Sequence, residues 1–300
     1  MRIRIGTRGS KLALIQAEEV KSAILASHLG MTPEQLVIMP ISTSGDKNPT
    51  QNLYDIGGKG LFIKELEEAL LANTIDMAVH SMKDVPGYIP EELFFNCILK
   101  REDPRDAFLS NVCDSIESLP KGATVGTCSP RRAVQTLALR PDVKIVMMRG
   151  NVDTRLSKLE SGGVDATILA VAGLKRLQVD ICKYRIIDEN ILLPAVAQGA
   201  IGVEVRRNNI KMLELLGTIN HQVSYQTVVA ERGFLEGLEA SCKTPVAAYS
   251  KVLDDHLYLK CLLAESDGNK IVTLEKFGLL AKGHSLGLEA AEELKDKLYS

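Results

Sequence analysis

The stretch Ile75-Asp-Met-Ala-Val-His-Ser-Met-Lys-Asp84 predicts the kind of fold that this chain adopts. Its first half, Ile75 to Val79, is a short apolar run of the kind found in strands that are buried on both faces. Its second half, from His80 to Asp84, is polar, so charged groups emerge at the carboxyl end of a buried strand. In open α/β sheets, ligands bind beside that end of the strands. The stretch therefore predicts an α/β fold in which Lys83 and Asp84 lie at the carboxyl end of a buried strand.

The residues before this stretch repeat the same strand and helix pattern. Ile3 and Ile5 alternate with arginines in a first strand, and Ser10 is suited to cap a helix with an apolar stripe of Ala13, Ala17, Val20 and Ile24. A second strand is expected at 36–43. The polar, glycine-rich segment 44–60 has no apolar periodicity, so we interpret it as a lid. Its Gly57-Gly-Lys-Gly is not a Walker A loop, because Lys59 is followed by Gly60 instead of Ser or Thr.

The residues after the stretch continue the alternation and then depart from it. Strands are expected at 123–127, 144–148 and 165–172, with helices beginning at Pro130 and Val152. Crossovers of this length imply a largely parallel sheet that is covered by helices. From Val246 three extended segments precede one final helix, which predicts a small antiparallel α+β domain.

Composition and charge exclude several classes of protein. The 300 residues are 45% hydrophobic, and 36 basic side chains oppose 38 acidic ones, which is the balance of a globular protein with no bias toward nucleic acid. No apolar run approaches the roughly 18 residues that a membrane-spanning helix needs. The amino terminus lacks the pattern of a secretory signal, so we expect a cytoplasmic protein. The six cysteines include no CxxC and the five histidines no HxxxH or HExxH, so no metal site is expected.

The arginines are the most informative charged residues. Six of them follow expected strands or begin expected helices: Arg8, Arg131, Arg132, Arg149, Arg155 and Arg176. A single arginine of this kind is usually a surface residue, but six that converge on one crevice indicate a ligand rich in carboxylates or phosphates. Ser129 as N-cap and Pro130 at the first helical position add backbone donors beside Arg131.

Two further residues have two readings on local sequence alone. Asp84 is either a catalytic carboxylate or an ordinary cap. Cys242 is either a buried turn cysteine or, with Lys243 beside it, a reactive thiol. His80 is expected to be a hydrogen-bonded structural residue.

Seven motifs, in this order along nearly the whole chain, resemble those of the porphobilinogen deaminase (hydroxymethylbilane synthase) family. They are Gly6-Thr-Arg-Gly-Ser-Lys-Leu-Ala-Leu, Ser42-Thr-Ser-Gly-Asp, Gly57-Gly-Lys-Gly-Leu-Phe, His80-Ser-Met-Lys-Asp-Val-Pro, Arg149-Gly-Asn-Val-Asp-Thr-Arg, Ala172-Gly-Leu-Lys-Arg-Leu and Leu193-Pro-Ala-Val-Ala-Gln-Gly-Ala.

The resemblance implies a transferase of tetrapyrrole and haem biosynthesis. It implies a dipyrromethane cofactor that is bound through a thioether to Cys242, stepwise head-to-tail condensation of four porphobilinogen molecules with loss of ammonia, and hydrolytic release of hydroxymethylbilane. It also implies a monomer, with two lobes that resemble type II periplasmic binding proteins and a small α+β domain. The expected boundaries are 1–95 with 200–218, 96–199, and 219–300, the last carrying Cys242.

The resemblance also implies roles for individual residues. Asp84 is the expected catalytic group and Cys242 the attachment point. The cofactor is expected to be held by Lys83, Ser129, Arg131, Arg132, Arg149, Arg155 and Gln198. The incoming porphobilinogen and the growing chain are expected to be bound with the help of Arg8, Ser10 and Arg176.

Three departures from the family pattern affect the backbone near these groups. They are Pro130 before the arginine pair, Ala197 before Gln198, and Ala240-Ser241 before Cys242. Glycine permits a positive φ that Ala and Ser resist, so the local geometry there is an open question.

Two rival functions predict different observations. A non-catalytic anion-binding protein of the same two-lobed architecture would carry no covalent group and show no turnover. A pyridoxal phosphate transferase that used Lys83 would be yellow, but the sequence offers it no phosphate cradle.

Overall fold

The structure, a computed structural model, describes residues 2–27, 30–44, 63–238 and 244–300. They form two compact units, each made of two separate segments of the chain. The first unit is Met1–Glu102 with Ala200–Val229, and the second is Asp103–Gly199 with Ala230–Ser300. The expected lobes 1–95 with 200–218 and 96–199, with 219–300 as a separate domain, stay a prediction.

The first unit contains a five-stranded sheet of order β2-β1-β3-β10-β4. Strands β1 (Ile3–Arg8), β2 (Leu36–Ile41) and β3 (Met77–Ser81) are parallel, as the sequence predicts. Strand β10 (Ile201–Arg206) runs antiparallel between β3 and β4 (Leu93–Ile98). The expectation of a largely parallel sheet is therefore wrong for this half of the unit. A strand that returns from a distant segment pairs by tertiary contacts, which a local hydrophobic pattern does not encode.

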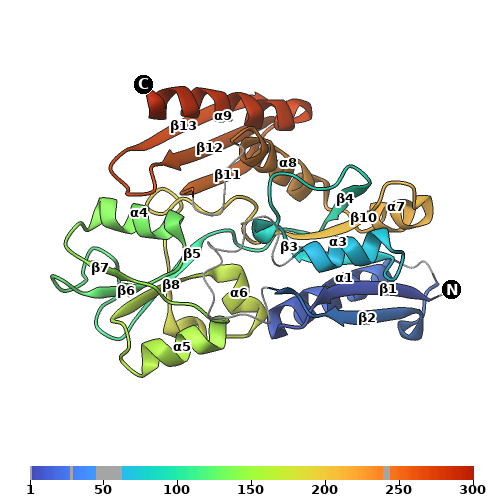
Figure 1. The fold of residues 1–300 in the computed structure, drawn as a ribbon, viewed down its shortest axis with the longest axis horizontal. Helices are drawn as coiled ribbons and strands as arrows, with labels where there is room; N and C mark the ends of the chain where they lie inside the picture. The colour runs from blue at the N-terminus through green and yellow to red at the C-terminus, as the bar shows by residue number, and fades with distance from the viewer. Residues whose placement is uncertain (1, 28–29, 45–62, 239–243) are drawn as a thin grey trace. The chain divides into compact units, whose positions relative to one another are not determined.

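Helices cover the sheet of the first unit and close its core. They are α1 (Lys11–Ala26), α3 (Lys64–Leu71) and α7 (Ile210–Gly217), and the 3-10 turns are η1 (Pro33–Gln35) and η2 (Met82–Asp84). The α1 stripe of Ala13, Ala17, Val20 and Ile24 is buried as expected. Figure 1 shows α1 and α3 beside the strands that they cover. The Ser10 hydroxyl accepts a hydrogen bond from the Ala13 amide, which confirms Ser10 as the N-cap.

The second unit contains another five-stranded sheet, of order β7-β6-β8-β5-β9. Its strands are β5 (Asp106–Ser110), β6 (Thr124–Gly126), β7 (Lys144–Val146), β8 (Ala166–Ala170) and β9 (Arg185–Ile186). Strand β6 is parallel to β7 and β8, whereas β5 is antiparallel to β8 and β9. Helices α4 (Pro130–Leu139), α5 (Val152–Glu160) and α6 (Val171–Arg176), and the turn η3 (Ile181–Lys183), connect the strands.

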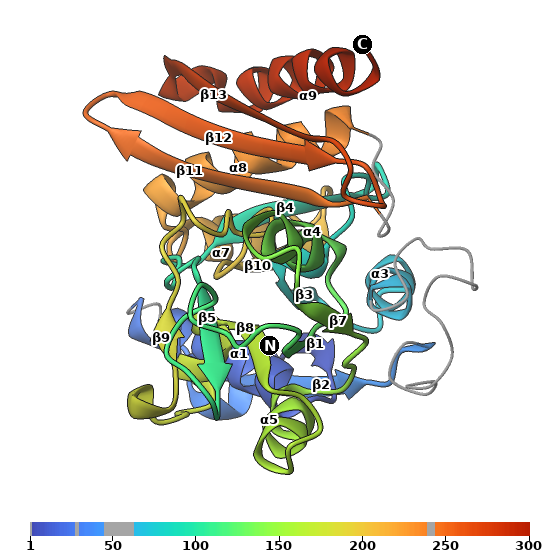
Figure 2. The same ribbon diagram turned by 90° about the vertical axis from the view of Figure 1, so that its left-hand side faces the viewer.

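The carboxyl-terminal part forms the predicted antiparallel sheet and final helix. Strands β11 (Val246–Leu253), β12 (His256–Ala264) and β13 (Ile271–Leu279) form a meander that leads through η4 (Leu280–Lys282) into α9 (Gly283–Tyr299). Figure 2 shows α9 lying along this sheet. The second half of α8 (Gln222–Gly237) packs closely on α9, because a Cβ on Gly233 or Gly287 would overlap the backbone of the other helix.

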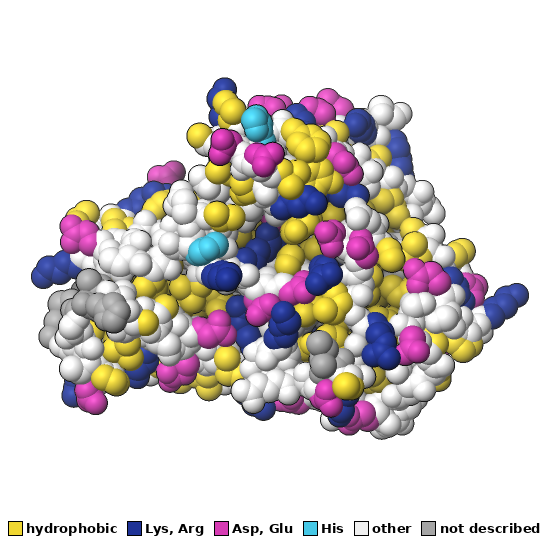
Figure 3. All heavy atoms as spheres, turned by 180° about the vertical axis from the view of Figure 1, so that it is seen from behind, with side chains coloured by type: hydrophobic (Ala, Val, Ile, Leu, Met, Phe, Trp, Pro, Cys, Tyr) yellow, Lys and Arg dark blue, Asp and Glu magenta, His cyan; other side chains and the backbone are white. Residues whose placement is uncertain are grey.

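The surface agrees with the charge balance of the sequence. Basic and acidic side chains are interspersed over the face drawn in Figure 3. Among the described residues, no helix is long and apolar enough to cross a membrane.

Candidate functional site

A small cavity in the first unit collects three of the predicted site residues. Arg8 ends β1, Ser10 caps α1, and Asp84 ends the turn η2 that follows β3. All three line a cavity of about 60 Å³. At roughly 30 Å³ of liquid volume per water molecule, it has room for about two waters.

The turn after β3 explains why polar groups lie at this cavity. Met82 is buried and anchors η2, whereas Lys83 and Asp84 are exposed. Gly202 lies opposite His80 in the neighbouring strand β10, and a Cβ there would overlap the Met82 sulfur. The glycine therefore makes room for the anchor that holds Asp84 at the edge of the cavity.

Sequence reasoning missed three polar residues at or behind this cavity. Gln16 lies on the buried face of α1 and lines the cavity, and its Oε1 accepts a hydrogen bond of 2.9 Å from the Ser81 hydroxyl. Its signal in the sequence was a glutamine within an otherwise apolar stripe. Glu204 lies on β10 with no exposed surface, 3.0 Å from His80 Nε2, and Glu67 lies on α3. His80 is hydrogen-bonded as expected, and it also lines the cavity.

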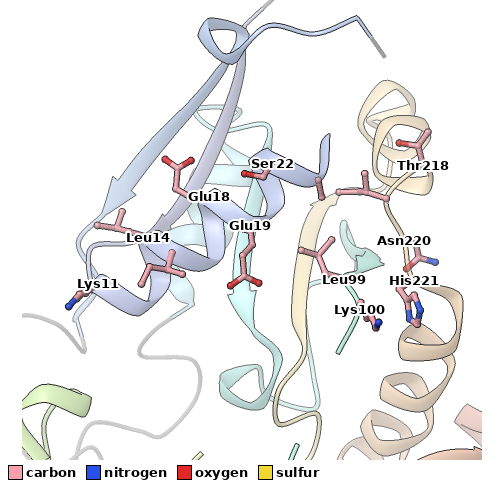
Figure 4. Close-up of a pocket in the computed structure, with 13 residues that line it drawn as sticks. Lys11, Leu14, Glu18, Glu19, Ser22, Leu99, Lys100, Thr218, Asn220 and His221 are labelled. Atoms are coloured by element: carbon pink, nitrogen blue, oxygen red, sulfur yellow. The ribbon is translucent and has the colours of Figure 1, made fainter. Parts of the chain in front are cut away.

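A larger groove of about 890 Å³ lies elsewhere on the first unit (Figure 4). Side chains of α1, among them Leu14 and Glu18, form one wall, and Leu99 and His221 belong to the other. None of the predicted site residues lines this groove. Volume alone therefore does not identify the site, and the smaller cavity is the candidate.

The second unit places Arg131 and Arg132 around one buried carboxylate. Arg131 Nη1 lies 2.7 Å from Asp106 Oδ2, and Arg132 Nη2 lies 2.6 Å from Asp106 Oδ1. Ser129 caps α4 as predicted, with its hydroxyl accepting from the Arg132 amide. Arg131 also donates to the Leu193 carbonyl at 2.7 Å. The sequence analysis did not name Asp106, because the polar run around it gave no sign of burial.

The ion pairs keep Asp106 charged although it is buried. Burial on its own would raise the pKa of Asp106, but the charges of Arg131 and Arg132 and their hydrogen bonds outweigh burial and hold that pKa well below its ordinary value. Two guanidinium groups against one carboxylate leave a net positive charge. The cluster is therefore a buried, fixed group of net positive charge.

Of the remaining predicted residues of this unit, Gln198 contacts the same cluster directly, and Arg176 and Arg155 contact residues next to Gln198 and Ser129 in the sequence. Gln198 Nε2 donates to Asp106 Oδ1 at 3.0 Å and to the Pro104 carbonyl at 2.7 Å. Arg176 Nη2 lies 3.3 Å from the carbonyl of Gly199, the next residue. Arg155 Nη2 lies 3.3 Å from the Cys128 sulfur, one residue before Ser129. Arg149 is half-buried at the end of the loop that precedes α5.

The structure explains how alanine is accommodated at position 197, where the sequence departs from the family pattern. Ala197 adopts a positive φ of 56°, and its amide donates to Glu231 Oε2 at 2.6 Å. Glu231 is fully buried, and its other oxygen accepts from the amide and hydroxyl of Ser250. The hydrogen bond to Glu231 holds alanine in a conformation that costs it roughly 1–2 kcal/mol. Pro130 fits the first position of α4. Ala240, Ser241 and Cys242 lie outside the described residues, as does most of the expected lid 44–60.

The geometry first defines a class: an α/β protein with a buried cluster of net positive charge in one unit and a carboxylate at a cavity in the other. Residues 3–214 match the family model for porphobilinogen deaminase, dipyromethane cofactor binding domain, and residues 225–296 match the model for its C-terminal domain. The chain belongs to the porphobilinogen deaminase family.

Relatives of known name agree over the full length. A porphobilinogen deaminase of Paracoccus denitrificans is 47% identical over 295 residues, which cover 98% of this chain and 94% of that protein. One of Orientia tsutsugamushi is 44% identical over 301 residues, which cover 100% of both chains. Among solved structures, the periplasmic VFT2 domain of Bordetella pertussis BvgS has a TM-score of 0.42 at 14% identity, covering 72% of this chain and 86% of that one.

Family membership confirms the predicted activity and cofactor. The protein is a transferase that joins porphobilinogen units with loss of ammonia, and it uses a dipyrromethane cofactor. Within the described residues, no group of His, Cys, Asp and Glu side chains is arranged to hold a metal ion.

Proposed function

We propose that Asp84 is the catalytic carboxyl group for the loss of ammonia from porphobilinogen. When the C–N bond of the aminomethyl group breaks, the electron pair leaves with nitrogen and the substrate becomes a cation. A carboxylate beside that carbon stabilises the cation, and the protonated form of the same carboxyl group can donate to nitrogen. The observation that carries the proposal is that Asp84 shares one small cavity with Arg8 and Ser10.

Arg8 and Ser10 bind the incoming porphobilinogen in this proposal. The substrate carries acetate and propionate groups, and a guanidinium group at the cavity wall can bind one of them by two parallel hydrogen bonds. Arg176, the third predicted substrate residue, belongs to the second unit and is half-buried. Its role in binding the substrate or the growing chain stays a prediction.

The residues of the second unit fit the carboxylate groups of a dipyrromethane. Arg131 and Arg132 leave a net positive charge around Asp106, Gln198 donates to the same carboxylate, and Ser129 caps the helix that carries both arginines. Arg155 contacts Cys128, next to Ser129, and Arg149 lies in the loop before α5. We infer that these residues, with Lys83, hold the cofactor that is attached to Cys242. When bound, the cofactor supplies the primer to which the first porphobilinogen is joined. Four units, followed by hydrolysis, give hydroxymethylbilane.

The variant Asp84→Asn tests the role of Asp84, with Asp114→Asn as a matched control. Asp114 is an exposed carboxylate that pairs with Arg185 at 3.3 Å. In Asp84→Asn we expect the mass of the covalent cofactor to remain while kcat falls by about 100-fold or more. The control Asp114→Asn is expected to keep both the mass of the covalent cofactor and the wild-type kcat. Wild-type turnover in Asp84→Asn would overturn the assignment.

Two further predictions concern the whole protein. A monomer in the cytoplasm is proposed, and light scattering of the purified protein tests the oligomeric state. A dimer at micromolar concentration would contradict the proposal.

A further inference from the structure

His80 and Glu204 form a buried hydrogen-bonded pair at the wall of the cavity that Asp84 also lines. His80 Nε2 lies 3.0 Å from Glu204 Oε2, and the two side chains are 4% and 0% exposed. The pair is formed diagonally across the sheet, because His80 lies opposite Gly202 and Glu204 lies opposite Ala78. The T-shaped contact of the imidazole with Phe95 fixes the ring further. Such a pair at a reaction cavity has a use beyond packing only if it can take part in proton transfer.

The hydrogen bond determines which nitrogen is available. A carboxylate that accepts from Nε2–H holds one proton there, so a second proton must be added at Nδ1. Glu204 Oε1 has no hydrogen-bond partner among the residues that the structure describes. The other oxygen of Glu204, Oε2, contacts His80 Nε2 and so fixes the orientation of the imidazole.

A third titratable group lies behind the pair. Glu67 on α3 has its pKa raised to about 7 by burial and by the charge of Glu204, an effect that His80 partly opposes. The charged groups around His80 are therefore Glu204 from β10, Glu67 from α3, and Arg8 and Asp84 at the cavity.

In each condensation the aminomethyl group enters as its ammonium form, and the active site must carry a proton from the reacting pyrrole carbon to the ammonia that leaves. The C–N bond of the aminomethyl group is replaced by a C–C bond, ammonia leaves with the electron pair of the broken bond, and the pyrrole carbon that forms the new bond loses its proton. If that proton stays on Asp84, the carboxylate is absent when the next substrate arrives. We propose that His80, backed by Glu204, accepts this proton from Asp84 at Nδ1 and passes it to the departing ammonia, which leaves as ammonium. Asp84 thereby returns to its anionic form and His80 to its neutral form.

The inference rests on the proposed role of Asp84, and the cavity provides the connection. The space that both residues line has room for about two waters, so a proton can pass between them without direct contact. His80 is thus a positioning residue that acts through Asp84. Glu204 acts through His80.

The variants His80→Gln and Glu204→Gln test the proposal. We expect kcat to fall about 100-fold in each while KM changes less than twofold. Because Asp84 must then release its proton to the solvent, kcat is expected to rise with the concentration of imidazole buffer at constant pH and ionic strength. A merely structural role would not produce this buffer dependence. Wild-type kcat, or a loss of kcat that imidazole does not restore, would overturn the proposal.

A measurement without turnover complements the kinetics. Nitrogen-15 NMR of histidine-labelled enzyme is expected to show neutral His80 with its proton on Nε2, and Glu204→Gln is expected to change that tautomer population. An Nδ1–H tautomer in the wild type would overturn the proposal. If His80→Gln gives no folded protein, Glu204→Gln carries the test, because glutamine keeps the shape and removes only the charge.

Two controls separate the possible failures. His284 Nε2 lies 2.9 Å from Glu236 Oε2 in an exposed pair. The variants His284→Gln and Glu236→Gln are therefore expected to keep the wild-type kcat, and this kcat is expected not to depend on the imidazole concentration. Turnover in Asp84→Asn would show that the role of Asp84 is wrong. If Asp84→Asn is inactive while Glu204→Gln behaves as wild type, only the proton acceptor is wrong.

Discussion

Arg131 Nη1 lies 2.7 Å from Asp106 Oδ2, and neither side chain is more than 5% exposed. Arg132 contacts the other oxygen of the same carboxylate. The two arginines that the family resemblance assigns to cofactor carboxylates are therefore held in place before any ligand binds. Preorganisation of this kind reduces the loss of side-chain conformational entropy on ligand binding.

Asp106→Asn is expected to destabilise the protein by about 3–5 kcal/mol at pH 7, because it leaves two buried guanidinium groups without a counter-charge. Asp142→Asn, which removes the partner of Arg140 in a more exposed pair, is expected to have little effect. Urea unfolding measures both variants. Equal stability of Asp106→Asn and the wild type would contradict the account of the cluster.

The depressed pKa of Asp106 also predicts how its contribution depends on pH. A carboxyl group whose pKa is lower in the folded state stabilises the protein above its unfolded pKa, near 4, and this stabilisation is lost as the pH falls further. The difference in unfolding free energy between wild type and Asp106→Asn is expected to be constant from pH 7 to pH 5 and to narrow below pH 4. A difference that widens on acidification would refute the ion-pair explanation.

For Glu67 we expect the opposite pH dependence of stability from that of Asp106. Its pKa is raised to about 7, so its stabilising neutral form is lost as the pH rises through that value. Relative to Glu67→Gln, the wild type is expected to lose thermal stability between about pH 4.5, the pKa of the unfolded state, and about pH 7, and to change little above that. Lys64 and Glu68 pair on the exposed side of the same helix, so Glu68→Gln serves as the control and is expected to show no such trend.

Ala197→Gly is expected to stabilise the protein by about 0.5–1 kcal/mol. Glycine removes the cost of a positive φ of 56°, although it also increases the entropy of the unfolded chain. Thermal unfolding measures the change, with Ala195→Gly as a control at a position without a positive φ. Destabilisation of Ala197→Gly beyond that of the control would contradict the assigned strain.

The sequence predicted the local elements well, and the reason is visible in particular residues. Ser10 and Ser129 cap the helices that they were expected to cap, and the stripe from Ala13 to Ile24 is buried, because these signals lie within a few residues of each other. The antiparallel strand β10 was not predicted, because its partners lie more than a hundred residues away in the chain.

Local sequence patterns also did not predict which charged groups are buried. Asp106 and Glu204 resemble surface residues in the sequence, since Asp and Glu are rarely buried without a partner. Their partners, Arg131 and His80, come from distant elements. Most of the expected lid and Cys242 lie outside the described residues, so the lid stays a prediction from the polar, glycine-rich composition of 44–60 and the attachment at Cys242 a prediction from the family resemblance.

The intact mass of the denatured protein, with peptide mapping across residue 242, tests the central claim most directly. A thioether survives denaturation, so the wild type is expected to exceed its sequence mass by one dipyrromethane, located on Cys242, whereas Cys242→Ser is expected to have its sequence mass. A wild-type protein that stays at its sequence mass even after incubation with porphobilinogen would contradict the account.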